Sequence, residues 1–180
     1  MAHREQVQFC TKIKNKYPAM FKNKNVLDIG SLDINGNNRY LFEGCNYIGI
    51  DVGQGKNVDI VCKAHEYDMP DNSYDLIVST ECLEHDMYYS QTLKNCVRLL
   101  KKDGLLLMTC ATTGRREHGT RRTSPQDAPL LSQHDNWQDY YKNLTEEDVR
   151  QSINVDAIFS EYMFETNIYS CDLYFYGVKK

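Results

Sequence analysis

Two acidic residues stand where apolar runs of the chain end. Asp28 lies within "VLDIG", and Asp51 closes "NYIGID", 21 positions after Gly30. An unpaired carboxylate buried at a strand end loses its hydration, so each acid needs a partner there. An acid about 20 residues beyond a glycine turn is placed to accept both hydroxyls of a ribose, because a carboxylate takes two donors at once. The spacing predicts a ligand that contains a nucleoside.

The loop between these acids narrows the choice of nucleoside ligand. Its sequence from Gly30 to Gly36 is "GSLDING", with two glycines far apart. A dinucleotide site needs G-x-G-x-x-G, so that backbone amides can close on a pyrophosphate at a helix N-terminus. A P-loop needs G-K-[ST], which does not occur in the sequence. Asp28 and this loop favour a ligand that carries ammonium and sulfonium charge instead.

Helices and strands alternate along the chain. Apolar residues recur every three to four positions over residues 3–17 and 90–102, which predicts two amphipathic helices. Thr145 with Asp148 three residues later is a capping-box pattern that predicts the start of another helix. Strand-like runs occupy residues 25–30, 46–51, 58–64, 74–80 and 104–110, and a hairpin is predicted from residues 157–165 and 172–180.

The order of these elements predicts the fold class. Strand–helix alternation is typical of an α/β protein with a mostly parallel sheet and helices on both faces, and the terminal hairpin adds an antiparallel part. The 180 residues, 41% of them hydrophobic, suit one domain. In such sheets ligands bind beyond the carboxyl ends of the strands. The polar residues at those ends are therefore expected to form one site.

Composition limits the location and the partners. No apolar run approaches the roughly 20 residues that span a bilayer, and the first residues are polar, so we expect a soluble, unsecreted, cytoplasmic protein that does not bind membranes. The seven cysteines are scattered without any C-x-x-C pair, which is typical of reduced thiols and predicts no metal site. The formal net charge of −4 disfavours nucleic acid as a partner. The oligomeric state stays open.

Four motifs in this order carry a family resemblance: "VLDIGSLDINGN", "YIGIDV", "CKAHEYDMPDNSYDLIVSTECLEH" and "LLKKDGLLLMTC". Over roughly residues 25–110 the chain resembles class I S-adenosylmethionine-dependent methyltransferases, most closely the small methyltransferase-domain proteins of the type 11 kind. The resemblance implies a Rossmann-like, seven-stranded sheet, a single methyltransferase domain over residues 1–180, and S-adenosylmethionine as cofactor.

The same resemblance assigns residues to the cofactor. It places the glycine loop against the methionine part, Asp51 on the ribose, the "KAH" segment at the adenine edge, and the end of the fourth strand next to the donor. The family's usual glycine-rich loop is altered here, with Leu32 and Ile34 where glycines are expected. The implied cofactor residues are Asp28, Gly30, Ser31, Asn35, Gly36, Asp51, Val52, Ala64, His65, Thr80 and Glu81.

Residues 112–143 form a long segment with little periodicity, which we call the insert. Loops of this length in a compact domain are usually functional or disordered, and its aromatic residues favour an ordered lid. We expect this lid to cover the acceptor, while the donor site does not depend on it. The alternative is that the insert is a plain surface loop. Its arginines could grip a phosphate or carboxylate, or form a solvated charge run. The candidate acceptor residues are Arg115, Arg116, Arg121, Arg122, Trp137 and Tyr141.

Methyl transfer from a sulfonium is an in-line displacement, so an oxygen acceptor also needs a base. His118 ranks first because it lies between the arginine pairs, and His85 and His134 are the alternatives. The predicted activity is O-methylation of a small-molecule or sugar-like acceptor. Three alternatives stay open: a noncatalytic S-adenosylmethionine-binding module, a methyltransferase that acts on nucleic acid or protein, and a nicotinamide-dependent oxidoreductase.

Overall fold

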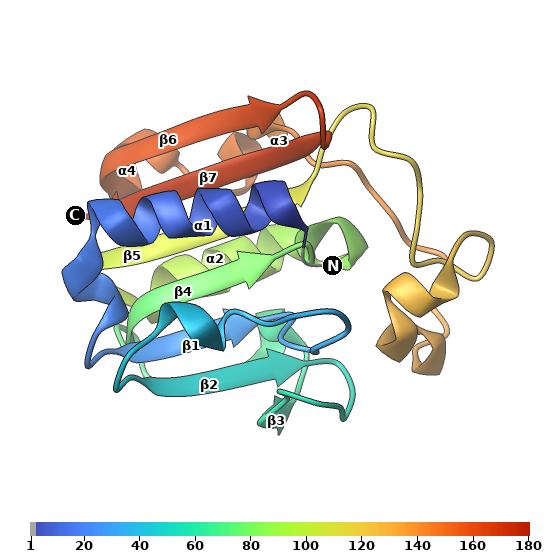
Figure 1. Cartoon of the computed structure of the whole chain (residues 1–180), viewed down its shortest axis with the longest axis horizontal. Helices are drawn as coiled ribbons and strands as arrows, with labels where there is room; N and C mark the ends of the chain where they lie inside the picture. Colours follow the sequence, from blue (N-terminus) through green and yellow to red (C-terminus); the bar gives the residue numbers. More distant parts are fainter. Residues whose placement is uncertain (1–2) are drawn as a thin grey trace.

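The computed structural model describes residues 3–180, and its centre is a seven-stranded sheet with the strand order β3-β2-β1-β4-β5-β7-β6 (Figure 1). The first five strands in this order run parallel, and β7 runs antiparallel to both β5 and β6. The strands are β1 (Asn25–Ile29), β2 (Asn46–Asp51), β3 (Ile60–Val61), β4 (Tyr74–Thr80), β5 (Leu100–Ala111), β6 (Phe159–Asn167) and β7 (Asp172–Lys179). The predicted fold class, including the C-terminal hairpin, is confirmed.

Helices cover both faces of this sheet. Helix α1 (Arg4–Lys16) crosses one face, where Phe9 and Ile13 pack against apolar residues of β4 and β5 (Figure 1). Helices α2 (Tyr89–Leu99), α3 (Glu146–Ser152) and α4 (Val155–Ile158) share the other core. Residues 76 and 78 of β4 face α1 and residue 77 faces α2, as the period of two requires. The capping box of Thr145 and Asp148 is present.

The bounds of three elements differ from the sequence-based expectations. The helix expected over residues 90–102 ends at Leu99, because fully buried Leu100 already pairs with Tyr74 in the sheet. Sheet pairing therefore places Lys101 and Lys102 in β5 rather than in the last helical turn. The strand expected over residues 58–64 shrinks to the exposed edge pair Ile60–Val61, and residues 157–158 close α4 instead of opening β6.

The connection between β1 and β2 contains no α-helix among the described residues. After Gly30 the chain forms an irregular loop and then only a three-residue 3₁₀ turn, η2 (Arg39–Leu41). A pyrophosphate site of the dinucleotide type uses the amides at the N-terminus of a helix that begins directly after the glycine loop. This connection offers no such helix, which agrees with the interpretation of the loop sequence.

The insert lies beyond the edge of the sheet to which β1, β2 and β4 point (Figure 1). Its regular structure consists of two short 3₁₀ turns, η5 (Pro125–Asp127) and η6 (Pro129–Gln133). Two further 3₁₀ turns, η3 (Ala64–Glu66) and η4 (Leu83–His85), lie between β3 and α2. Within residues 3–180, no helix is both long and apolar enough to cross a bilayer.

Candidate active site

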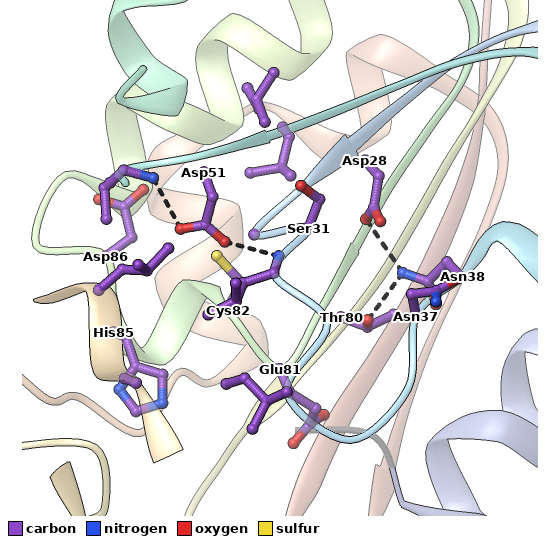
Figure 2. A pocket seen from close by; sticks show the side chains of 18 of the residues that line it. Asp28, Ser31, Asn37, Asn38, Asp51, Thr80, Glu81, Cys82, His85 and Asp86 are labelled. Carbon is purple, nitrogen blue, oxygen red and sulfur yellow. Dashed lines mark hydrogen bonds between the residues drawn. The ribbon is translucent and has the colours of Figure 1, made fainter. Parts of the chain in front are cut away.

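A cavity of about 420 Å³ opens where β1, β2 and β4 end. The loop after β1, the start of α1, residues 80–82, residues 85–86 and part of the insert form its walls (Figure 2). Its carboxylates are those of Asp28, Asp51, Glu81, Asp86 and Asp127, and no lysine or arginine among residues 3–180 lines it. The cavity is therefore suited to a ligand that carries positive charge.

Asp51 is held in place by the backbone around it. Its two carboxylate oxygens accept hydrogen bonds from the N–H groups of Leu32 at 3.0 Å and Val52 at 2.8 Å (Figure 2). Burial raises the pKa of Asp51, while these two backbone bonds oppose the rise. Each oxygen keeps a further lone pair. The carboxylate can therefore accept two hydroxyl groups of a ligand without first reorienting.

Asp28 is the more deeply buried acid, with 1% of its surface exposed. It accepts a hydrogen bond from the side-chain amide of Asn38 at 3.1 Å and another from the hydroxyl of Tyr47. Burial raises the pKa of Asp28 to about 7, although both hydrogen bonds act in the opposite direction. The same Asn38 amide also donates to Thr80 at 3.1 Å, so it links β1 to β4 (Figure 2).

This pKa leads to a testable pH dependence of ligand binding. A cationic ligand favours the ionised form of Asp28, so binding should lower its pKa and release a proton. We expect the affinity for S-adenosylmethionine to rise by up to roughly tenfold between about pH 6 and pH 7.5. Calorimetry across this range measures the effect. In Asp28→Asn the affinity should no longer change with pH over this range. An equal change of affinity with pH in that variant would assign the titration to another group.

Gly30 begins the loop in a conformation that other residues rarely adopt. Its φ is +75°, and an added Cβ would lie 2.3 Å from Sγ of Cys82. Farther along, the carboxylate of Asp33 accepts the N–H of Gly36 at 2.8 Å and pairs with Lys56 at 2.8 Å. The loop thus runs close over residue 82 and keeps its backbone against the cavity.

The start of α1 is fixed to the strand ends by a cluster of charged groups that the sequence analysis missed. Nε2 of His3 lies 3.0 Å from Asp172 and 3.5 Å from Glu81, whose other oxygen accepts the hydroxyl of Thr109 at 2.9 Å. Although burial acts against it, the contacts with these two acids raise the pKa of His3 to about 10. This anchor brings Gln6 and the residue after it into the cavity wall.

Most of the residues that the resemblance assigned to the cofactor share this one cavity. The exception is His65, whose ring lies against Tyr88 with centroids 4.2 Å apart and does not line the cavity. Their roles stay predictions. The lining residues from that set are Asp28, Gly30, Ser31, Asn35, Gly36, Asp51, Val52, Ala64, Thr80 and Glu81.

Several lining residues were not expected from the sequence. Asp86 follows directly after the quoted "STECLEH" and accepts hydrogen bonds from the N–H of Tyr88 at 2.8 Å and from the hydroxyl of Thr92, so it also holds the start of α2. The asparagines that follow the glycine loop could have been suspected from their position. The others carry no sequence signal. The set comprises Gln6, Val7, Asn37, Asn38, Tyr40, Cys62, Cys82, Asp86 and residues 127–131.

The insert contributes to the same cavity as the donor residues. Leu130, Leu131 and Trp137 line it together with Asp51, and Trp137 is only 5% exposed. The expectation that the donor site is independent of the insert therefore does not fit this arrangement. Tyr141, in contrast, lies outside the cavity lining, against the rings of two histidines.

The four arginines of the insert lie outside the cavity lining. Arg115 pairs with Asp172 at 3.2 Å, Arg121 pairs with Asp139, and Arg122 pairs with Glu117 at 3.1 Å. The side chain of Arg116 is exposed. Because three of these cations already have acidic partners, their predicted role in gripping an anionic acceptor stays a prediction that this arrangement does not favour.

The candidate bases occupy different positions. His85 lines the cavity, and burial lowers its pKa to about 3, so it is neutral at neutral pH. His118 lies behind it, with ring centroids 4.9 Å apart, and burial lowers its pKa too. His134 contacts the carbonyl of Val52 at 2.9 Å. The position of His85 in the wall favours it over His118 as the group that faces an acceptor, although neither role is tested.

Comparisons with known proteins agree with this fold and site. Residues 27–108 match the model of the family described as "Methyltransferase domain". Over these residues the match and the strand order confirm the predicted likeness to class I S-adenosylmethionine-dependent methyltransferases, and the cofactor of that class is S-adenosylmethionine. Comparison with curated proteins finds no match.

Solved structures share the fold at low sequence identity. A Burkholderia thailandensis 1,6-didemethyltoxoflavin-N1-methyltransferase is similar with a TM-score of 0.66 at 14% identity, over 97% of this chain and 78% of that chain. A SAM-dependent methyltransferase from Aquifex aeolicus is similar with a TM-score of 0.64 at 14% sequence identity, over 99% of this chain and 94% of that chain. Haemonchus contortus phosphoethanolamine N-methyltransferase 2 is similar with a TM-score of 0.65 at 18% sequence identity. The likeness covers 94% of this chain but 52% of that chain, so this chain spans about half the length of the Haemonchus protein.

Proposed function

We propose that this chain transfers the methyl group of S-adenosylmethionine to a small-molecule acceptor in the cavity at the carboxyl ends of β1, β2 and β4. The observation that carries the proposal is the oriented carboxylate of Asp51 in a cavity lined by acids and by no lysine or arginine of residues 3–180. In this proposal Asp51 holds the ribose, the loop from Gly30 holds the methionine part, and the carboxylates favour the cationic donor.

The chain's own contribution to catalysis is alignment and exclusion of water. An in-line displacement at a methyl group needs the acceptor atom directly behind the carbon and little covalent help from the protein. Leu130 and Trp137 line the cavity together with Asp51 and would remove water from the reacting atoms. For an oxygen acceptor, His85 lies in the wall where its ring can form a hydrogen bond with the hydroxyl group. Its pKa of about 3 is too low for the ring to hold the proton, so the proton would pass to solvent.

The acceptor itself is proposed as a small, sugar-like hydroxyl compound, as the sequence analysis predicted. The cavity volume and the cover by the insert support a small acceptor, while the acidic lining argues against an anionic one. An acceptor nitrogen is the second candidate. The acidic lining suits an amine, and the names of two structurally similar proteins specify N-methylation.

Transfer of labelled methyl groups tests this function. Enzyme is incubated with methyl-labelled S-adenosylmethionine and a metabolite extract, and mass spectrometry identifies the labelled product and the methylated atom. We expect a labelled small molecule that Asp51→Ala fails to produce. Transfer of the labelled methyl group to RNA, DNA or protein in preference to every small molecule would contradict the proposal of a small-molecule acceptor. Tight donor binding with no labelled product in any fraction would make the chain a binding module.

A further inference from the structure

A second cluster of ligating groups lies between the end of β4 and the insert. Glu84 and His85 belong to η4, and His118 belongs to the insert. One ligating atom from each of the three lies within 4.8 Å of the other two. Glu84 is fully buried, and the two histidines are 7% and 9% exposed. Two segments far apart in the sequence thus bring a carboxylate and two imidazoles together away from solvent.

Three polar atoms of this cluster lack hydrogen-bond partners within residues 3–180. Neither carboxylate oxygen of Glu84 makes a hydrogen bond, and neither does Nδ1 of His85. The nearby cation Arg115 is already engaged by Asp172 and by the carbonyl of Ser170. A buried carboxyl group can keep a negative charge only beside a cation or hydrogen-bond donors. A cation bound at this place would supply such a partner.

The second histidine is oriented as a metal ligand would be. Nδ1 of His118 lies 3.1 Å from the carbonyl of Arg116, where it can donate and leave Nε2 with a free lone pair. Metal-binding histidines usually donate their other ring N–H to a carbonyl or a carboxylate in this way. The hydroxyl of Tyr141, whose ring lies 5.0 Å from His118, is buried and also without a hydrogen bond.

We propose that Glu84, His85 and His118 bind one divalent transition-metal ion of the Zn²⁺ type. Two imidazoles and a carboxylate form a common zinc donor set and leave a fourth position for water or another ligand. Ligand atoms bound tetrahedrally at zinc lie roughly 3.4 Å apart. The ligating atoms of this cluster lie within 4.8 Å of one another, so they need to approach by up to about 1.4 Å. The expectation of no metal site considered cysteine spacing alone and overlooked this mixed set.

The position of the Glu84, His85 and His118 cluster indicates what a bound ion would do. It joins the turn after β4 to the insert, which also carries the cavity wall residues Leu130 and Trp137. Bound metal should therefore hold the insert over the cavity, and His85 takes part in both the cluster and the wall. Metal binding itself does not rest on the proposed methyl transfer, and it can be measured without donor or acceptor.

Metal titration of chelator-treated protein tests the proposal. We expect one Zn²⁺ per chain by calorimetry, and one Co²⁺ with visible absorption typical of a site of low coordination number. Glu84→Gln and His118→Ala should each weaken binding by about 100-fold or more. The control His134→Ala, which removes an insert histidine outside the cluster, should bind like the wild type. Circular dichroism establishes that each variant folds.

Limited proteolysis gives a second readout, which reports on the insert rather than on metal affinity. Cleavage within residues 112–143 of the wild type should slow when Zn²⁺ is added, and Glu84→Gln should show no such protection. Absence of stoichiometric Zn²⁺ or Co²⁺ binding by the wild type would overturn the proposal. Full binding by folded Glu84→Gln and His118→Ala would overturn it as well, because the ion would then lie elsewhere.

Discussion

Replacing Asp51 by alanine is expected to weaken S-adenosylmethionine binding by about 10- to 150-fold. This carboxylate is positioned to accept the ribose hydroxyls, and the loss of hydrogen bonding to a charged group is expected to cost about 1.5–3 kcal/mol in total. Its two backbone bonds fix its orientation before the ligand arrives, so little reorganisation offsets the gain. Calorimetric titration with S-adenosylmethionine and S-adenosylhomocysteine measures the loss.

A matched variant separates this effect from a general loss of negative charge. Asp68 has a side chain 98% exposed and does not line the cavity, so Asp68→Ala should bind the donor as the wild type does. Thermal unfolding of both variants verifies that they fold. An unchanged donor affinity in folded Asp51→Ala would reject the ribose assignment, although the fold would stand.

Replacing Trp137 by alanine should damage both donor binding and turnover. The side chain is 5% exposed and lines the cavity together with Leu130. Loss of a large apolar contact of about 1.5–3 kcal/mol should weaken donor binding by roughly tenfold or more. We expect kcat/KM for methyl transfer to fall by about 100-fold or more, because an open cavity admits water and positions the acceptor poorly.

The conservative variant Trp137→Phe keeps most of the apolar wall and should recover much of the activity. It also controls for unfolding, because deletion of a buried tryptophan side chain can lower the free energy of unfolding by about 3–5 kcal/mol. Wild-type binding and kinetics in folded Trp137→Ala would mean that the insert is a surface excursion. A loss of turnover with unchanged donor affinity would restore the original expectation of a lid over the acceptor alone.

The strand ends and their acids could be predicted because their signals are local. Asp51 follows an apolar run at a fixed distance from Gly30, and parallel strands bring such ends to one edge of the sheet. The end of the helix before β5 was less predictable. Leu100 continues the helical spacing of apolar residues, yet its pairing with Tyr74 decides its conformation.

The rest of the site depends on tertiary placement that leaves no periodic trace. Residues 127–131 reach the cavity only because the insert folds back over the sheet edge. The path of an irregular segment leaves no repeating pattern in the sequence from which it could be predicted. Likewise, His118 meets Glu84 across a sequence separation of 34 residues. Composition indicated an ordered insert but not which of its side chains face inward.

The most direct test of the central claim is calorimetric titration of the wild-type chain with S-adenosylmethionine and, separately, with NAD⁺. We expect stoichiometric binding of S-adenosylmethionine, because the cavity is acidic and Asp51 is positioned to accept the hydroxyl groups of a nucleoside. We expect much weaker binding of NAD⁺, because no helix among the described residues directly follows the glycine loop to hold a pyrophosphate. NAD⁺ binding tighter than that of S-adenosylmethionine would contradict the account.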